Sequence, residues 1–185
     1  TEVRVTGGDV TVEATFTSTT YALEKRADLR LNVSGHVDDV YEIEVDGDFL
    51  YVGGSNGSSE GTVMRIDVSN PANPFVTHYT DTANGSTGRA QGLAINSNHI
   101  FVADSYNGIY RFDKDDLGSR ISDNSIGGID DVEMHGNSPS VVLAIRSDRL
   151  YAYDSSSSSM ATGGYAQLND NGHRVAAYGD YAFVT

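Results

Sequence analysis

The sequence predicts an all-β protein, a β-propeller made of four-stranded antiparallel blades, and three observations support this prediction. Short segments of strand-forming residues recur along the 185 residues at intervals of about 40–50. Turn-forming pairs such as Asp46-Gly47 stand between successive segments, as in β-hairpins. Three kinds of segment follow one another in a fixed order in each repeat. Propeller blades need this pattern, because a lone four-stranded sheet cannot bury both of its faces, whereas radial stacking against neighbouring sheets can.

The first kind of segment begins with a small or acidic residue and ends in an aromatic residue followed by Val. It occurs as Asp-Phe-Leu-Tyr-Val at 48–52, Asn-His-Ile-Phe-Val at 98–102 and Asp-Tyr-Ala-Phe-Val at 180–184. Weaker copies lie at 140–143 and 9–12. The run of apolar and aromatic residues predicts a short strand at each copy.

The other two kinds flank the first. One ends on Asp and follows it, at 63–67, 109–113 and 150–154, with a weaker copy at 20–24. The other precedes it, at 40–45, 91–95, 131–134 and 174–178. A fourth, outer strand is predicted at 75–79 and 165–168. Residues 21–31 contain good helix formers, but their position in the repeat favours a strand.

These segments divide the chain into a single propeller domain of about four and a half repeats. The repeats are 1–35, 36–87, 88–128, 129–171 and an incomplete 172–185. A closed ring has about four to eight blades. Either the chain is part of a larger ring, or residues 1–16 pair with 174–184 to complete the last blade. The first explanation is favoured, because residues 1–32 already form a repeat of their own.

Residues 63–74, Val-Met-Arg-Ile-Asp-Val-Ser-Asn-Pro-Ala-Asn-Pro, resemble the repeat of LVIVD-type β-propellers. In that pattern a Gly-Leu-x-Ile-x-Asp-Val-Ser-x-Pro-x-x-Pro stretch follows a strand similar to residues 179–184. The later copies at 109–113 and 150–154 lack both prolines, so the resemblance is good over 36–79 and weak elsewhere. It implies an extracytoplasmic or cell-surface propeller. It implies no catalytic residue, because the family has no agreed chemistry.

The composition excludes several classes of function. The formal charge is −14, from 26 acidic and 12 basic residues, which disfavours nucleic acid as a partner. No apolar run approaches the roughly 20 residues that span a bilayer, and without Cys there are no disulfides. The acids are 19 Asp and 7 Glu, and only 2 of the 12 bases are Lys. This bias resembles proteins of extreme halophiles or their viruses, and the alternative is an ordinary acidic extracellular protein.

Paired acids stand just before two of the predicted inner strands, where a propeller has its axial channel. The candidate binding residues at these positions and their equivalents are Asp38, Asp39, Arg89, Asp130, Asp131, His173 and Arg174. Solvated ion pairs across the channel are the favoured interpretation. The alternatives are acid/base catalysis or a structural Ca²⁺ or other cation on Asp38, Asp39, Asp130 and Asp131, since Ca²⁺ takes oxygen ligands. No other cofactor is predicted.

The expected function is a non-catalytic, surface-exposed scaffold that recognises a protein or a glycan. The expected location is extracellular, at a cell surface or on a virion spike, and copies of the chain or other subunits of an assembly are further expected partners. Loops at 53–62 and 80–90 are expected to build the binding surface. One alternative is a propeller hydrolase or lyase with acids at the axial mouth. Another is a structural subunit of a larger shell or filament.

Overall fold

The computed structural model describes residues 2–6, 9–13, 16–17, 20–21, 25–30, 36–83, 85–123, 125–160 and 162–185. These residues form strands and turns, and among them no helix could cross a membrane. The strands are β1 (Glu2–Thr6), β2 (Asp9–Glu13), β3 (Phe16–Thr17), β4 (Thr20–Tyr21), β5 (Lys25–Arg30), β6 (Asp39–Asp46), β7 (Phe49–Ser55), β8 (Gly61–Asp67), β9 (Phe75–Asp81), β10 (Ala90–Ile95), β11 (His99–Asp104), β12 (Gly108–Asp113), β13 (Ile121–Asp123), β14 (Asp131–His135), β15 (Ser138–Arg146), β16 (Arg149–Asp154), β17 (Thr162–Gln167), β18 (Val175–Tyr178) and β19 (Tyr181–Val184).

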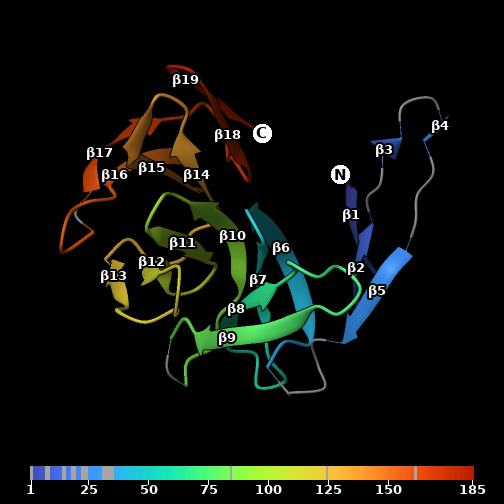
Figure 1. The fold of residues 1–185 in the computed structure, drawn as a ribbon. Coiled ribbons are helices and arrows are strands. Elements are labelled where there is room, and N and C mark those ends of the chain that lie inside the picture. Colours follow the sequence, from blue (N-terminus) through green and yellow to red (C-terminus); the bar gives the residue numbers. More distant parts are fainter. Residues whose placement is uncertain are drawn as a thin grey trace.

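Three four-stranded antiparallel sheets form the centre of the molecule, and each is a blade whose strands pair in sequence order. The first blade is β6–β9, the second β10–β13 and the third β14–β17. A two-stranded sheet, β18–β19, follows the third blade. The sheets succeed one another around an arc (Figure 1), and the inner strand β10 contacts both β6 and β14, while β14 contacts β18. The predicted all-β propeller of four-stranded blades is confirmed.

The strands of residues 36–185 lie where the repeats predict them. The segments at 40–45, 48–52, 63–67 and 75–79 are β6, β7, β8 and β9, and their counterparts form the next two blades. The outer strand of the second blade, β13, was not predicted, because Ile121–Asp123 is short and carries little alternation. The turn at Gly47 has a φ of 58° and that at Gly179 a φ of 57°, the left-handed conformation that glycine adopts without strain.

The N-terminal strands are arranged differently from the three blades. β1, β2 and β5 form a three-stranded sheet, and β3 pairs with β4. Within the stretch 21–31 that was predicted as a strand, β5 confirms the extended conformation, and residues 22–24 and 31 lie outside the described residues. The weaker copy at 20–24 is described only at Thr20–Tyr21. The assignment of the five repeats to one domain stays a prediction.

Apolar side chains from adjacent sheets interlock at each joint of the arc. Tyr51 of β7 packs with Ile100 and Val102 of the second blade. Phe101, on the opposite face of that blade, packs with Val142 and residues around it in the third blade. Leu143 and Ile145 of the third blade pack against Val175 of β18. The second and third blades therefore turn alternate residues of their second strand to the preceding and the following sheet, as the two-residue period of a strand requires.

Close approach of the backbone explains the glycines at 53 and 54, and it corrects the expectation of a long loop at 53–62. Gly53 and Gly54 belong to β7, and Gly61 and Thr62 belong to β8, so the connecting loop is confined to 56–60. A Cβ on Gly53 would lie 2.6 Å from the carbonyl oxygen of Ala90 in the second blade. Gly53 is therefore needed for packing between blades, and Gly54 for its close approach to Asp39 within its own blade, whereas the sequence composition suggested a flexible loop. The second expected loop, at 80–90, is shortened in the same way by β9 and β10.

The acid that ends the third strand of each blade closes the following turn. The carboxylate of Asp67 accepts a hydrogen bond from the amide of Ser69 at 2.9 Å, and Asp113 accepts one from Asp115 at 2.8 Å. Asp154 does the same for Ser156 at 2.8 Å. These are Asx turns, in which a short side chain replaces a backbone acceptor. The repeated Asp therefore has a structural role.

Candidate functional site

The inner strands β6, β10, β14 and β18 each place one residue at each of two successive heights, or levels, along the axial channel. The antiparallel pairs Ile43↔Val52, Leu93↔Val102, Val132↔Ala144 and Val175↔Val184 occupy equivalent positions in their sheets. The residues just before them form the first level: Glu42, Gly92, Asp131 and Arg174. The residues just after them form the second level: Glu44, Ala94, Glu133 and Ala176. The channel wall thus depends on one residue per sheet at each level.

Arg174 connects the first-level residues across the channel. Its guanidinium donates to Glu42 Oε2 at 3.0 Å, across 132 positions of sequence, and to the carbonyl oxygen of Gln91 at 3.4 Å. The same Nη1 lies 3.5 Å from Asp131 Oδ1. Asp131 Oδ2 accepts the backbone N–H of Val175 at 2.9 Å. Arg174 therefore contacts an inner strand of each of the three blades.

Gly92 makes room for Asp131 at this level. A Cβ on Gly92 would lie 2.5 Å from Asp131 Oδ1, so any side chain there would displace the carboxylate. The Asp131 side chain is only 10% exposed. Its place against Gly92, the Val175 amide and Arg174 is therefore fixed from three sides.

Four carboxylates, Glu42, Glu44, Asp131 and Glu133, form what we call the axial carboxylate cluster. Burial raises the pKa of Glu44 to about 7, and the negative charges of Glu42 and Glu133 add to this rise. Burial likewise raises the pKa of Glu133, Asp131 and Glu42, although Arg174 opposes the rise for Asp131 and Glu42. Partial desolvation and mutual repulsion both disfavour the ionised forms. Glu44 can therefore take up or release a proton near neutral pH.

Two hollows follow the channel and share Glu44 and Glu133 in their walls. One of about 260 Å³ is lined by the whole cluster together with Arg174. The other, of about 370 Å³, is lined by Asp46, Asn96, Met134 and Lys114 among others. The two hollows are therefore adjacent, and we refer to them together as the polar passage; acidic groups outnumber basic ones in its walls.

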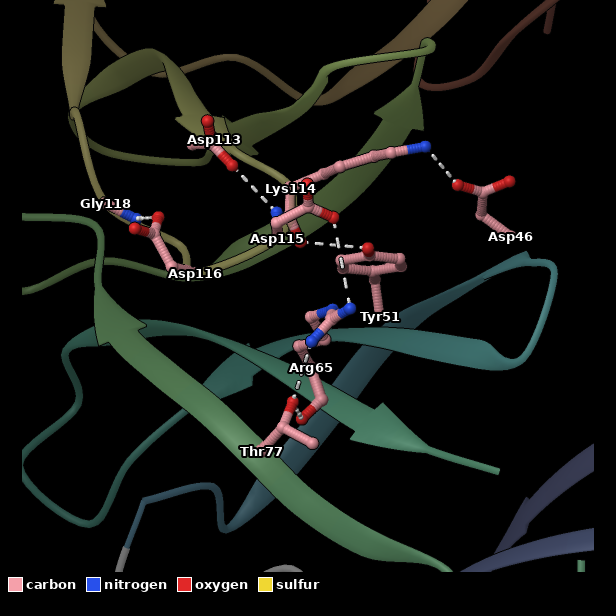
Figure 2. A network of polar contacts seen from close by, with 9 residues as sticks. All are labelled: Asp46, Tyr51, Arg65, Thr77, Asp113, Lys114, Asp115, Asp116 and Gly118. Carbon is pink, nitrogen blue, oxygen red and sulfur yellow. Dashed lines mark hydrogen bonds and ion pairs between the residues drawn. The ribbon is translucent and has the colours of Figure 1, made fainter. Parts of the chain in front are cut away.

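Lys114 comes to this passage from the outer part of the second blade. Its ammonium donates to Asp46 Oδ2 at 2.5 Å, and its backbone carbonyl accepts the hydroxyl of Tyr51 at 2.9 Å. Figure 2 shows the lysine extending from the turn after β12 toward Asp46, with Arg65 approaching the neighbouring Asp115 from below. The Arg65–Asp115 pair is 3.9 Å apart. These contacts bind the first blade to the second beside the passage.

The residues predicted from the sequence are only partly brought together. Arg174 and Asp131 meet, as described above. Asp130 accepts weak hydrogen bonds from the side chain of Gln91 at 3.5 Å and the amide of Ser147 at 3.3 Å.

The other candidates lie farther out on the same rim. Asp38 and Asp39 are exposed, with Asp38 beside Gly57, and the Arg89 guanidinium lies 5.7 Å from the centre of the Tyr41 ring. His173 is exposed, and its amide donates to the Thr185 carbonyl at 2.6 Å. Within the part of the chain that the structure describes, no three acidic or histidine side chains are placed to hold a metal ion.

Sequence reasoning missed Glu42, Glu44 and Glu133. It sought acids ahead of the inner strands, whereas these three are within the strands themselves. The available signal was the alternation of Glu42 with Ile43 and of Glu44 with Val45. Charged residues spaced by two on an inner strand share one face of the sheet, and the apolar residues between them take the other face, which packs.

Comparisons with known proteins agree with this architecture. The model of the LVIVD repeat family matches residues 34–82 and 87–110, which together are less than half of the chain. No curated protein matches. The computationally designed Ika8 protein superimposes with a TM-score of 0.65 at 11% identity, over 98% of this chain and 54% of its own. The designed Ika4 protein gives a TM-score of 0.57 at 10% identity, over 78% of this chain and 83% of its own.

These likenesses concern the fold, and this chain spans about half the length of the Ika8 chain that it matches. The match to the LVIVD model covers the first blade and continues into β12 of the second. The chain is therefore a β-propeller whose first two blades carry sequence similar to the LVIVD repeat.

Proposed function

We propose that the chain is a non-catalytic, surface-exposed propeller scaffold that recognises a macromolecular partner at the mouth of its axial channel. The observation that carries the proposal is the excess of carboxylate over cationic groups along the polar passage. Arg174 contacts Glu42 and Asp131, whereas among the residues described no ion pair reaches Glu44 or Glu133. A cationic group of a partner would supply the missing charge, so a protein with an exposed basic segment is favoured over a neutral glycan.

The test is calorimetric titration with two probes, a hexa-arginine peptide and a neutral hexasaccharide. The peptide is expected to bind, and the Glu44→Gln/Glu133→Gln double variant is expected to weaken binding about tenfold, which is ~1.4 kcal/mol. The matched control is Asp48→Asn/Asp170→Asn, which removes two exposed acids away from the passage. Equal weakening by both double variants would show general attraction to an acidic protein and refute the site. Binding of the saccharide alone would replace a protein partner with a glycan.

The proposal includes an extracellular, cell-surface or virion location at high salt. The bias toward Asp and against Lys supports it, because short hydrated carboxylates keep a protein soluble where the Debye length is only about 3 Å. Melting followed by circular dichroism in low and in molar KCl tests the salt dependence. A stability that does not rise with salt would contradict a halophilic origin.

A second candidate function, a hydrolase or lyase, has one observation in its favour. Glu44, with a pKa of about 7, is near enough to Glu42 and Glu133 for their charges to raise that pKa. A protonated acid beside an ionised one is the arrangement that glycoside hydrolysis uses. Release of nitrophenol from aryl glycosides and aryl esters between pH 5 and 7, abolished by Glu44→Gln, would support this function over the scaffold.

A further inference from the structure

Asp104, at the end of β11, is a fully buried carboxylate that holds loops of the first two blades together. Its Oδ1 accepts hydrogen bonds from the backbone amides of Tyr106 at 2.9 Å and of Asn107 at 3.0 Å. Its Oδ2 accepts the hydroxyl of Thr82, which follows β9, at 2.5 Å. Asp104 and Thr82 are both 0% exposed. A Cβ on Gly88 would overlap Asp104 Oδ2, so the connection from β9 to β10 closes directly over the carboxylate.

This buried carboxylate belongs to one joint and is not part of the repeat. The equivalent positions of the first and third blades, two residues after Val52 and Ala144, hold Gly54 and Arg146. A carboxylate removed from water destabilises the fold unless hydrogen-bond donors surround it. Asp104 has such donors, and they fix the turn after β11 and the connection from β9 to β10. The second blade thus carries a network that the blade architecture itself does not require.

The same network joins three loops into one surface, which we call the loop platform and define as residues 56–60, 85–88 and 105–107. The side-chain amide of Asn107 donates to the carbonyl oxygen of Thr87 at 2.8 Å. The amide of Gly88 donates to the carbonyl oxygen of Ser59 at 2.8 Å. Asn56 braces the first loop, since its side-chain oxygen accepts two backbone amides of that loop at 2.9 and 3.0 Å. Hydrogen bonds within the chain therefore hold the platform in place before a ligand binds.

The loop platform presents one aromatic ring among uncharged groups. Its exposed residues are Gly57, Ser58, Ser59, Gly85, Ser86, Thr87 and Tyr106. Its one charged side chain, Glu60, is partly buried and accepts the side-chain amide of Asn56 at 2.8 Å. Tyr106 is 56% exposed, although its backbone is fixed by Asp104. Antibody loops use the same residue types, because a tyrosine ring gives contact area at low entropic cost and small polar groups adapt their hydrogen bonds.

We propose that the loop platform binds a neutral saccharide, with the ring of Tyr106 stacked on a sugar ring and the hydroxyls of Ser86 and Thr87 bonded to sugar hydroxyls. An uncharged ligand is favoured, because the exposed residues of the platform offer no charge to an acidic or a basic one. A protein is disfavoured, since stable protein interfaces bury about 800 Å² per partner around several aromatic or arginine anchors. The inference is independent of the proposed axial site, because no platform residue belongs to the axial carboxylate cluster.

The first measurement is binding of the labelled chain to a printed array of neutral and acidic oligosaccharides. Neutral members are expected to bind, and Tyr106→Ala is expected to weaken this binding about tenfold through loss of the stacked ring. The matched control is Tyr165→Ala, which removes a ring 55% exposed on β17 and is expected to bind as the wild type does. Glu44→Gln/Glu133→Gln is also expected to leave saccharide binding unchanged, which separates this surface from the axial site.

An NMR titration of the wild-type chain with the neutral saccharide that binds best then locates the site without a substitution. The amide signals of residues 58–59, 86–87 and 106 are expected to shift, while those of β14–β17 are expected not to change. Absence of binding to every neutral member of the array, or equal binding by the wild type and Tyr106→Ala, would overturn the proposal. Shifts confined to the axial carboxylate cluster, or platform shifts produced only by the hexa-arginine peptide, would also overturn it.

Discussion

Arg111 occupies in β12 the register position that Arg65 occupies in β8, and both arginines reach to the turn after the third strand of the following blade. Arg65 pairs with Tyr51 of β7, and Arg111 pairs with Phe101 of β11. Arg65 approaches Asp115 at 3.9 Å, and Arg111 donates to the carbonyl oxygens of Ser155 and Ser157 at 2.7 and 2.8 Å. The register position of Arg65 and Arg111 therefore links the first blade to the second and the second blade to the third.

The two arginines are expected to differ in their contribution to stability. Arg111 is 6% exposed and makes two charge-assisted hydrogen bonds, so Arg111→Ala should lower the free energy of unfolding by about 2–4 kcal/mol. Arg65 stacks on Phe49 at 3.5 Å, but its carboxylate partner is largely exposed, so Arg65→Ala should cost about 1 kcal/mol. Urea unfolding of both variants checks the order. Equal losses would show that packing of the side-chain stems, and not the hydrogen bonds, joins the blades.

Replacing Arg174 should destabilise the channel to a moderate extent. Arg174→Gln removes the cation from Asp131, whose side chain is 10% exposed, and from Glu42, which is 30% exposed. Because Arg174 is itself half exposed, the expected loss is about 1–2 kcal/mol, less than for a fully buried pair. The loss should be larger at pH 8 than at pH 4, since the uncompensated carboxylates are ionised at the higher pH. Arg149→Gln, which removes an exposed cation near Asp148 and Tyr165, is the control and should change stability less than Arg174→Gln does, with no difference between the two pH values.

Glu44 should make the fold less stable as the pH rises. Its pKa is 4.5 when unperturbed and about 7 in the folded chain, so the folded state holds the proton more tightly. The penalty is therefore absent below pH 4.5, grows as the pH rises to about 7, and is constant above that. After allowance for partial solvent screening it amounts to about 1–2 kcal/mol.

Glu44→Gln should accordingly raise the melting temperature at pH 8 by about 2–6 °C and leave it nearly unchanged at pH 4. Thermal melts at the two pH values measure this difference, with Asp48→Asn as the control at an exposed turn. A gain of the same size at both pH values would mean that the substitution acts through packing and not through charge.

Gly128 should tolerate no side chain. A Cβ there would overlap the carbonyl oxygen of Ser105, so Gly128→Ala must move the backbone and should cost about 1–3 kcal/mol. Gly163→Ala is the matched control, because its Cβ would lie 3.5 Å from the nearest atom, the Ala152 carbonyl oxygen. Its effect should remain within about 0.5 kcal/mol. Similar denaturation midpoints for the two variants would refute the close approach at Gly128.

The sequence predicted the blades well because strand alternation and turn pairs are local signals. The positions of β6, β7 and β8 follow from them directly. The role of Gly53 could not be predicted, since the atom that excludes a side chain there, the Ala90 carbonyl oxygen, belongs to another blade. The axial site was found only at Asp131 and Arg174, because the composition drew attention to paired acids. The pKa of Glu44 and of Glu133 is raised mainly by burial, which arises only when the inner strands assemble, and nearby carboxylates add to the rise.

The third blade has Ala152 at the position of Arg65 and Arg111, as its pairing with Leu143 shows. No guanidinium therefore crosses from this position to β18–β19, and that joint relies on Val175 and its apolar neighbours. This position of the repeat therefore supplies a polar contact at the first two joints and none at the third. When the two ends of the chain are pulled apart, β18–β19 should therefore unfold first, in a small separate step, before the three blades unfold together.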